Sequence, residues 1–166
     1  MSALMKGFVI AIVQVLLVSA IGAKFLYDRA HYPRVWAPTA PYDPNLPIRG
    51  RYVSISVLVD GKGVDASGDP GTFYGRFAVE GDRLIAIKDA NGPHMFLLRG
   101  CGDAQCWQFY EPLAYFIPEH VKDPSLRHAG ETLWVEVTVP PKGAPRPIRL
   151  GVKKDEDPAP VELRLE

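Results

Sequence analysis

The segment RYVSISVLVD, residues 51–60, alternates between two kinds of side chain over its whole length. Valine or isoleucine occupies every second position from Val53 to Val59, so an extended strand here has one apolar face. The opposite face carries Tyr52, Ser54, Ser56 and Leu58, a more polar set that is typical of a solvated side. The pattern predicts a strand that covers a hydrophobic core, and it favours a mainly β fold.

Further strand-like runs follow toward the C-terminus. They lie at residues 73–79, 83–88, 95–99, 107–110, 114–117, 133–139 and 148–152. The chain contains 16 prolines and 15 glycines, and turn-forming residues separate these runs. With no long helical pattern among them, we expect one antiparallel β sandwich or partly open barrel of about 7–8 short strands.

The N-terminal segment GFVIAIVQVLLVSAIGA, residues 7–23, contains no charge. As a helix it is about 26 Å long, and a further turn through residues 25–27 lets it cross a bilayer core. We therefore predict one transmembrane anchor over residues 1–27. Two alternatives remain: a cleaved signal peptide with Lys6 as its basic region, and a core helix, which needs a larger protein around it.

One strongly polar side chain, Gln14, lies at membrane depth in this segment. Small residues follow between Ser19 and Ala23. Amide side chains and small residues favour close helix packing in membranes. Gln14, Ser19 and Ala23 are therefore predicted contacts for a partner helix.

Three further segments complete the predicted organisation. Residues 28–50 contain five prolines, which indicate an extended, semi-rigid spacer. Residues 51–152 form the β-rich domain, because the remaining length is that of one domain. Residues 153–166 form a charged tail, in which Val161 to Leu165 allow an edge strand.

Charge excludes one class of partner. Only Lys6 and Lys24 precede residue 25, so the remainder of this neutral chain has a formal charge of −2. Its basic residues are scattered among acidic ones, whereas nucleic-acid binders concentrate them. We expect no nucleic acid as partner. Without a phosphate loop, calcium loop or dinucleotide fingerprint, we also expect no cofactor.

Cys101 and Cys106 enclose a short Gly-containing loop between two predicted strands. In an oxidising compartment such a pair forms a disulfide that stabilises the hairpin. Alternatives are a zinc site completed by His94 and His120, a redox-active pair, or a cysteine nucleophile activated by histidine. We predict the disulfide and no metal.

A cluster of Glu119, His120 and His128 is a candidate proton-transfer or ligand site, although solvated loops hold the same residue types. No serine-hydrolase motif occurs, and no other catalytic set converges. Seven aromatic residues are candidates for the core or for a cleft. They are Trp36, Tyr42, Trp107, Phe109, Tyr110, Tyr115 and Trp134.

The stretch from Asp43 to Val57 resembles the GDYXXLXY protein family of bacterial membrane-anchored proteins. Gly50, Tyr52 and Ile55 keep the family's pattern, whereas Arg51 replaces its aspartate and Val57 its second tyrosine. Further similarity lies in a proline-rich lead-in, in YFIPE at residues 115–119 and in LWVEV at residues 133–137. A guanidinium at position 51 removes any cation-binding or turn-capping role of the family's carboxylate.

The resemblance implies a domain exported across the bacterial inner membrane, with the N-terminus cytoplasmic and the C-terminal domain periplasmic. The charges flanking the helix favour the opposite orientation, so export rests on the cysteines and the resemblance. We expect a non-enzymatic accessory module that binds the bilayer and a multi-pass membrane protein or complex. The alternatives are an envelope enzyme or ligand-binding domain at Glu119, His120 and His128, or a metal or redox site at Cys101 and Cys106.

Overall fold

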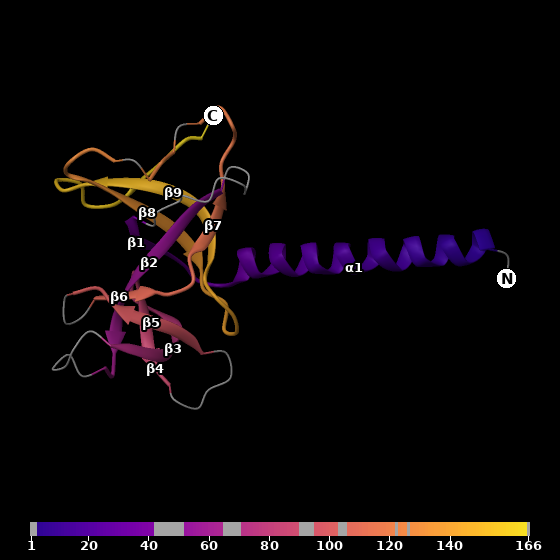
Figure 1. Cartoon of the computed structure of the whole chain (residues 1–166), viewed down its shortest axis with the longest axis horizontal. Helices are drawn as coiled ribbons and strands as arrows, with labels where there is room; N and C mark the ends of the chain where they lie inside the picture. The colour runs from indigo at the N-terminus through magenta and orange to yellow at the C-terminus, as the bar shows by residue number, and fades with distance from the viewer. Residues whose placement is uncertain are drawn as a thin grey trace. The chain divides into compact units, whose positions relative to one another are not determined.

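The computed structural model describes residues 3–41, 52–64, 71–89, 95–102, 106–121, 123–125 and 127–165. The chain forms two compact units, of which the first ends at Tyr32 and the second begins at Pro33 (Figure 1). The first unit is one helix, and the second is built from strands. This confirms the predicted fold class of one N-terminal apolar helix followed by a mainly β domain.

Helix α1 spans Ala3–His31. From Leu4 to His31 it is long and apolar enough to cross a membrane, and its large apolar side chains are exposed. Its last turn is fixed by His31, whose Nδ1 lies 3.0 Å from the carbonyl oxygen of Tyr27 and whose ring stacks on Tyr27 at 4.0 Å. The helix thus extends one turn beyond the predicted end at residue 27, because no proline intervenes before Pro33.

The second unit contains ten strands among its described residues, somewhat more than predicted. They are β1 (Arg34–Pro41), β2 (Tyr52–Lys62), β3 (Thr72–Glu80), β4 (Arg83–Lys88), β5 (Phe96–Gly100), β6 (Cys106–Phe109), β7 (Leu113–Phe116), β8 (Glu131–Thr138), β9 (Arg146–Lys154) and β10 (Val161–Glu162). Every predicted strand is present within a few residues of its expected bounds. The additional strands are β1 and β10.

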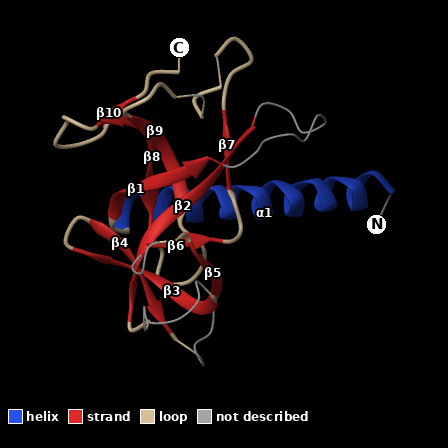
Figure 2. Cartoon of the chain, turned by 60° about the vertical axis from the view of Figure 1, so that its left-hand side comes forward, coloured by secondary structure: helices blue, strands red, loops and turns tan. Residues whose placement is uncertain are grey.

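Strand β2 belongs to two β structures at once. Its C-terminal half pairs with β4 in parallel and with β6 antiparallel, which closes a five-stranded barrel in the order β2, β4, β3, β5, β6. Its N-terminal half pairs with β1 and β7, and β1 continues through β8 and β9 to β10. Figure 2 shows β2 running from the sheet that holds β8 and β9 into the barrel.

The predicted spacer over residues 28–50 is wrong for its described part. Residues 28–31 continue the helix, and Arg34–Pro41 is a strand between β8 and β2. The paired positions of β1 with β8 end at Pro38, and those with β2 begin at Thr39, so no position is paired on both sides. Such a strand tolerates prolines that a fully paired central strand excludes. Residues 42–50 lie outside the described residues.

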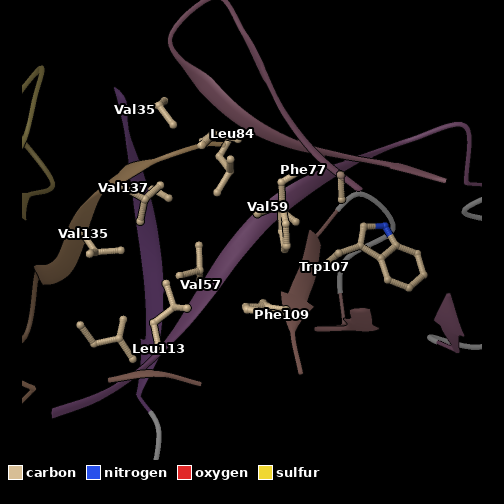
Figure 3. Close-up of a cluster of buried hydrophobic side chains, with 14 of the residues drawn as sticks. Val35, Val57, Val59, Phe77, Leu84, Trp107, Phe109, Leu113, Val135 and Val137 are labelled. Atoms are coloured by element: carbon tan, nitrogen blue, oxygen red, sulfur yellow. The ribbon is translucent and has the colours of Figure 1, made fainter. Parts of the chain in front are cut away.

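The hydrophobic core is continuous from the sheet into the barrel. Figure 3 shows side chains of β1, β2, β6 and β8 together, among them Val35, Val57, Phe109 and Val137. The predicted apolar face of β2, from Val53 to Val59, is buried at every alternate position.

The predicted solvated face of β2 is wrong at one position. Ser56 is 1% exposed, and it contacts Gln108 and Phe109 of β6. Its hydroxyl donates to the carbonyl oxygen of Phe109 at 3.2 Å and accepts from Nε2 of Gln108 at 2.6 Å. Both hydrogen bonds offset the cost of burying the hydroxyl.

The predicted tail over residues 153–166 begins too early. Lys153 and Lys154 are the last residues of β9, and Val161 pairs with Val152 as an edge strand. The amide of Leu163 donates to the carbonyl oxygen of Leu150 at 2.9 Å and extends this pairing. The C-terminal segment is therefore part of the sheet.

Candidate functional site

A cleft of about 600 Å³ lies between the β1, β8 and β9 part of the sheet and the barrel. Its apolar lining includes Trp36, Pro38, Trp134, Pro158 and Pro160. Its charged lining includes Arg34, Asp60, Asp82, Arg83 and Lys153. We call this site the tryptophan cleft. Its volume lies within the range of ligand and peptide sites.

Strand register places the two tryptophans on the same face of the sheet. On β1, Trp36 pairs with Glu136 of β8, and Pro38, two positions later, pairs with Trp134. Alternate residues of a strand share a face, so Trp36 and Trp134 lie on the same side of the sheet. Trp134 in turn pairs with Gly151 on β9. A Cβ at Gly151 would lie 2.8 Å from Cζ3 of Trp36 and 3.0 Å from the carbonyl oxygen of Val161. Glycine at this position therefore lets the Trp36 ring lie against the sheet.

Two cations lie over the tryptophan rings. The guanidinium of Arg149 is 5.6 Å from the Trp36 ring centroid, and Nζ of Lys153 is 5.3 Å from that of Trp134. These distances are within the range of cation–π attraction. The rings are thus held in place by charged neighbours and remain partly exposed.

Arg149 is fixed by two carboxylates. Its Nε donates to Glu136 at 2.6 Å, and its Nη1 donates to Glu162 at 2.5 Å. The hydrogen bond that Arg149 donates to Glu136 is the main cause that raises the pKa of Arg149 above its ordinary value. Because this pKa is higher in the folded than in the unfolded protein, the charged arginine stabilises the fold at every pH below its unfolded-state pKa. This stabilisation is lost only when the pH rises through the folded-state pKa. The positive charge over the Trp36 ring is therefore constant at physiological pH.

The cleft also contains an unsatisfied donor. Nε1 of Trp134 is buried and has no hydrogen-bond partner in the described structure. Buried indole N–H groups normally have a partner, because leaving one unsatisfied is costly.

Cys101 and Cys106 form a disulfide that links the end of β5 to the start of β6, with Cα atoms 5.5 Å apart. The amide of Cys101 also donates to the carbonyl oxygen of Cys106 at 3.2 Å. Within the described ranges, no group of three histidine, cysteine or acidic side chains is placed to hold a metal ion. His94, from the zinc alternative, lies outside those ranges.

Replacing both cysteines by serine is expected to lower the free energy of unfolding by about 2 kcal/mol, because the open loop gains entropy in the unfolded state. Urea unfolding of the full chain in mild detergent measures the difference. Alkylation without reductant, followed by intact-mass measurement, should show that neither thiol reacts. Two alkylated cysteines in protein isolated under non-reducing conditions would contradict the disulfide.

The structure places the three residues of the predicted proton-transfer or ligand site on two segments. Glu119 and His120 lie exposed in the turn after β7, outside the tryptophan cleft. His128 lies on a separate pocket near β8. That these three residues act together stays a prediction.

The predicted partner-helix residues Gln14, Ser19 and Ala23 are all exposed on α1. At about 100° per residue, Ser19 and Ala23 lie on nearly the same face, whereas Gln14 lies about 140° away from Ser19. A single partner helix therefore cannot contact all three at the centre of one interface.

The family-like segments are adjacent where they are described. Tyr52 and Ile55 lie on β2, whereas Gly50 and Arg51 are outside the described residues. The 115–119 block begins on β7, which pairs with β2 so that Tyr52 is opposite Phe116, their ring centroids 5.6 Å apart. The 133–137 block lies on β8, separated from β2 by β1.

The aromatic candidates divide between core and cleft. Trp107 and Phe109 are in the core, Trp36 and Trp134 line the cleft, Tyr115 is partly buried and Tyr110 is exposed. Tyr42 lies outside the described residues. The signal that identifies Trp36 is the alternation of residues 34–38, in which Val35 and Ala37 face the core and Trp36 does not.

No protein-family model matches the chain, and neither a curated protein nor a solved structure is significantly similar to it.

Proposed function

We propose that this chain is a non-enzymatic, membrane-anchored accessory module that binds a larger membrane protein complex. The helix holds the module in the bacterial inner membrane, with its N-terminus cytoplasmic and the β unit periplasmic. The β unit binds an extended segment of a multi-pass membrane protein in the tryptophan cleft. This function agrees with the membrane-anchored, exported location that the GDYXXLXY resemblance implies.

The observation that carries the proposal is the tryptophan cleft. Tryptophan and arginine are enriched among residues that dominate protein-binding energies, and here both occur on one face. The prolines at 158 and 160 add the rigid apolar surface that extended peptides contact.

Two features support export of the β unit. A disulfide between Cys101 and Cys106 persists in an oxidising compartment and is rare in the cytoplasm. The adjacent strands β2 and β7 hold two of the family-like segments. Long domains also cross membranes largely regardless of flanking charge, so Lys24 and Arg29 do not prevent this orientation.

The helix is the second part of the proposed interface. Gln14 would hydrogen-bond a polar group of one neighbouring helix, a contact worth about 1 kcal/mol. Ser19 and Ala23 would allow close packing on the other side. Because these faces differ, the helix fits best between two helices of a multi-pass partner.

Crosslinking in native membranes tests the proposal. A photo-reactive residue at position 38, inside the cleft, is expected to give one main crosslinked membrane protein. Combining it with Trp36→Ala and Trp134→Phe should reduce that product about tenfold, since interface tryptophans are typically worth 1.4 kcal/mol or more.

Tyr74→Ala is the matched control, because Tyr74 is an aromatic residue of β3 that is 56% exposed and outside the cleft. It should leave the crosslink unchanged. A chain that gives no membrane-protein crosslink and migrates alone in mild detergent would refute the accessory function. Equal crosslinking by the double variant would refute the cleft as its binding site.

A further inference from the structure

A second pocket, of about 370 Å³, is lined by Ser125, residues 127–129 and residues of β1, β2 and β8. Its described lining includes Arg127, His128, Ser54 and Thr132. Glu131 is the only carboxylate in that described lining, and its Oε1 lies 4.0 Å from Nζ of Lys154. We call this site the arginine pocket. None of its described lining residues belongs to the tryptophan cleft.

Arg127 is partly buried, and its Nε is shielded from solvent without a hydrogen-bond partner in the described structure. Other arginines of the β unit differ. Arg149 binds two carboxylates and Arg83 lies 3.4 Å from Asp60. A buried charged donor without a partner is rare in proteins, because its desolvation is not compensated. The described chain thus supplies no hydrogen-bond partner for Nε of Arg127.

The surrounding polar groups favour an anion over a cation. The hydroxyls of Ser54 and Thr132 make no hydrogen bond within the described structure, so both can donate to a ligand. The nearby Asp123 carboxylate already accepts from the amide and the hydroxyl of Ser125, at 2.8 and 2.7 Å. The hydroxyl of Thr39 donates to the carbonyl oxygen of Leu133 at 2.8 Å and closes the pocket floor.

We propose that the arginine pocket binds a small oxyanion, a phosphate or carboxylate group, with Arg127 as its charged partner. Guanidinium donors match the paired oxygens of these groups and bind them more strongly than a point charge does. Ser54 and Thr132 supply further donors, and the exposed ring of His128 lies at the rim. This site is independent of the accessory function proposed for the tryptophan cleft.

Titration of the full chain in zwitterionic nanodiscs tests the proposal, with inorganic phosphate and acetate as probes. Phosphate or acetate is expected to raise the melting temperature and to give a saturable calorimetric signal. Nanodiscs that contain phosphatidylglycerol form a second arm. Protection by that lipid in place of the free anions would assign the same oxyanion chemistry to a headgroup.

Variants at Arg127 separate a binding role from a structural one. Arg127→Gln is expected to weaken anion binding by about tenfold or more, and Arg127→Lys by less, since lysine keeps only the charge. The exposed Arg164→Gln, which removes the same charge elsewhere, should bind as the unmodified chain does.

The melting temperature without anion gives the second readout. Arg127→Met should keep or raise it, because methionine needs no buried partner. A lower melting temperature for this variant without anion would show a structural arginine and overturn the proposal. The same holds if no oxyanion binds, or if Arg127→Gln binds as well as the control.

Discussion

Replacement of Phe109 by alanine is expected to lower the free energy of unfolding by about 3–5 kcal/mol. Phe109 is 1% exposed, and its ring meets Phe77 and Phe96 edge to face, with centroids 5.1 and 5.6 Å away. The alanine would leave a cavity where β6 closes the barrel on β2. Since a domain is stable by only about 5–15 kcal/mol, this one change removes a large fraction of the total.

Urea unfolding of the full chain in mild detergent, followed by circular dichroism, measures the loss. Tyr110→Ala is the control, because the neighbouring ring is 58% exposed and should change stability by about 0.5 kcal/mol at most. Equal effects of the two substitutions would contradict the position of Phe109 in a packed barrel core.

The second large effect concerns the helix. The double substitution Val13→Arg and Leu17→Arg is expected to shift the protein from the membrane to the soluble fraction. Both residues are exposed near the middle of α1, and each arginine costs about 2.5–3.5 kcal/mol at the centre of a membrane helix. Membrane fractionation with carbonate washing and immunodetection measures the distribution.

Leu26→Arg is the control for this experiment. Residue 26 lies near the end of α1, where a long cationic side chain reaches the headgroups at little cost. This variant should stay in the membrane. An intact mass that includes residues 1–27 would show that the segment is an anchor and not a cleaved signal peptide. Membrane retention of the double variant would contradict the anchor.

Local patterns were sufficient for part of this structure. The alternation from Val53 to Val59 predicted the central strand β2, and short-range geometry predicted the bridge between Cys101 and Cys106. Both depend on neighbours close in sequence. The prolines of β1 argued against a strand in the sequence. They are tolerated because the pairing of β1 with β8 ends at Pro38 and its pairing with β2 begins at Thr39. That arrangement is a property of the sheet and not of the segment.

The candidate sites were harder to predict for the same reason. Trp36 and Trp134 are 98 positions apart, and only the pairing of β1 with β8 brings them to one face. The sequence alone predicts that Ser56 is solvated, and only its contact with β6 in the folded chain shows that it is buried. Arg127 carries no sequence signal, because the lack of a partner at its Nε depends on how residues 127–129 lie beside β1, β2 and β8.

The position of β1 between β8 and β2 has a consequence for how the chain matures. During synthesis β1 emerges first, but β8, which forms most of its ladder, follows only after the whole barrel has been made. Pairings this distant in sequence form slowly, and until then β1 exposes an open edge on which other chains can add. We therefore expect the newly made chain to need protection of this edge until residues 131–138 arrive and pair with it.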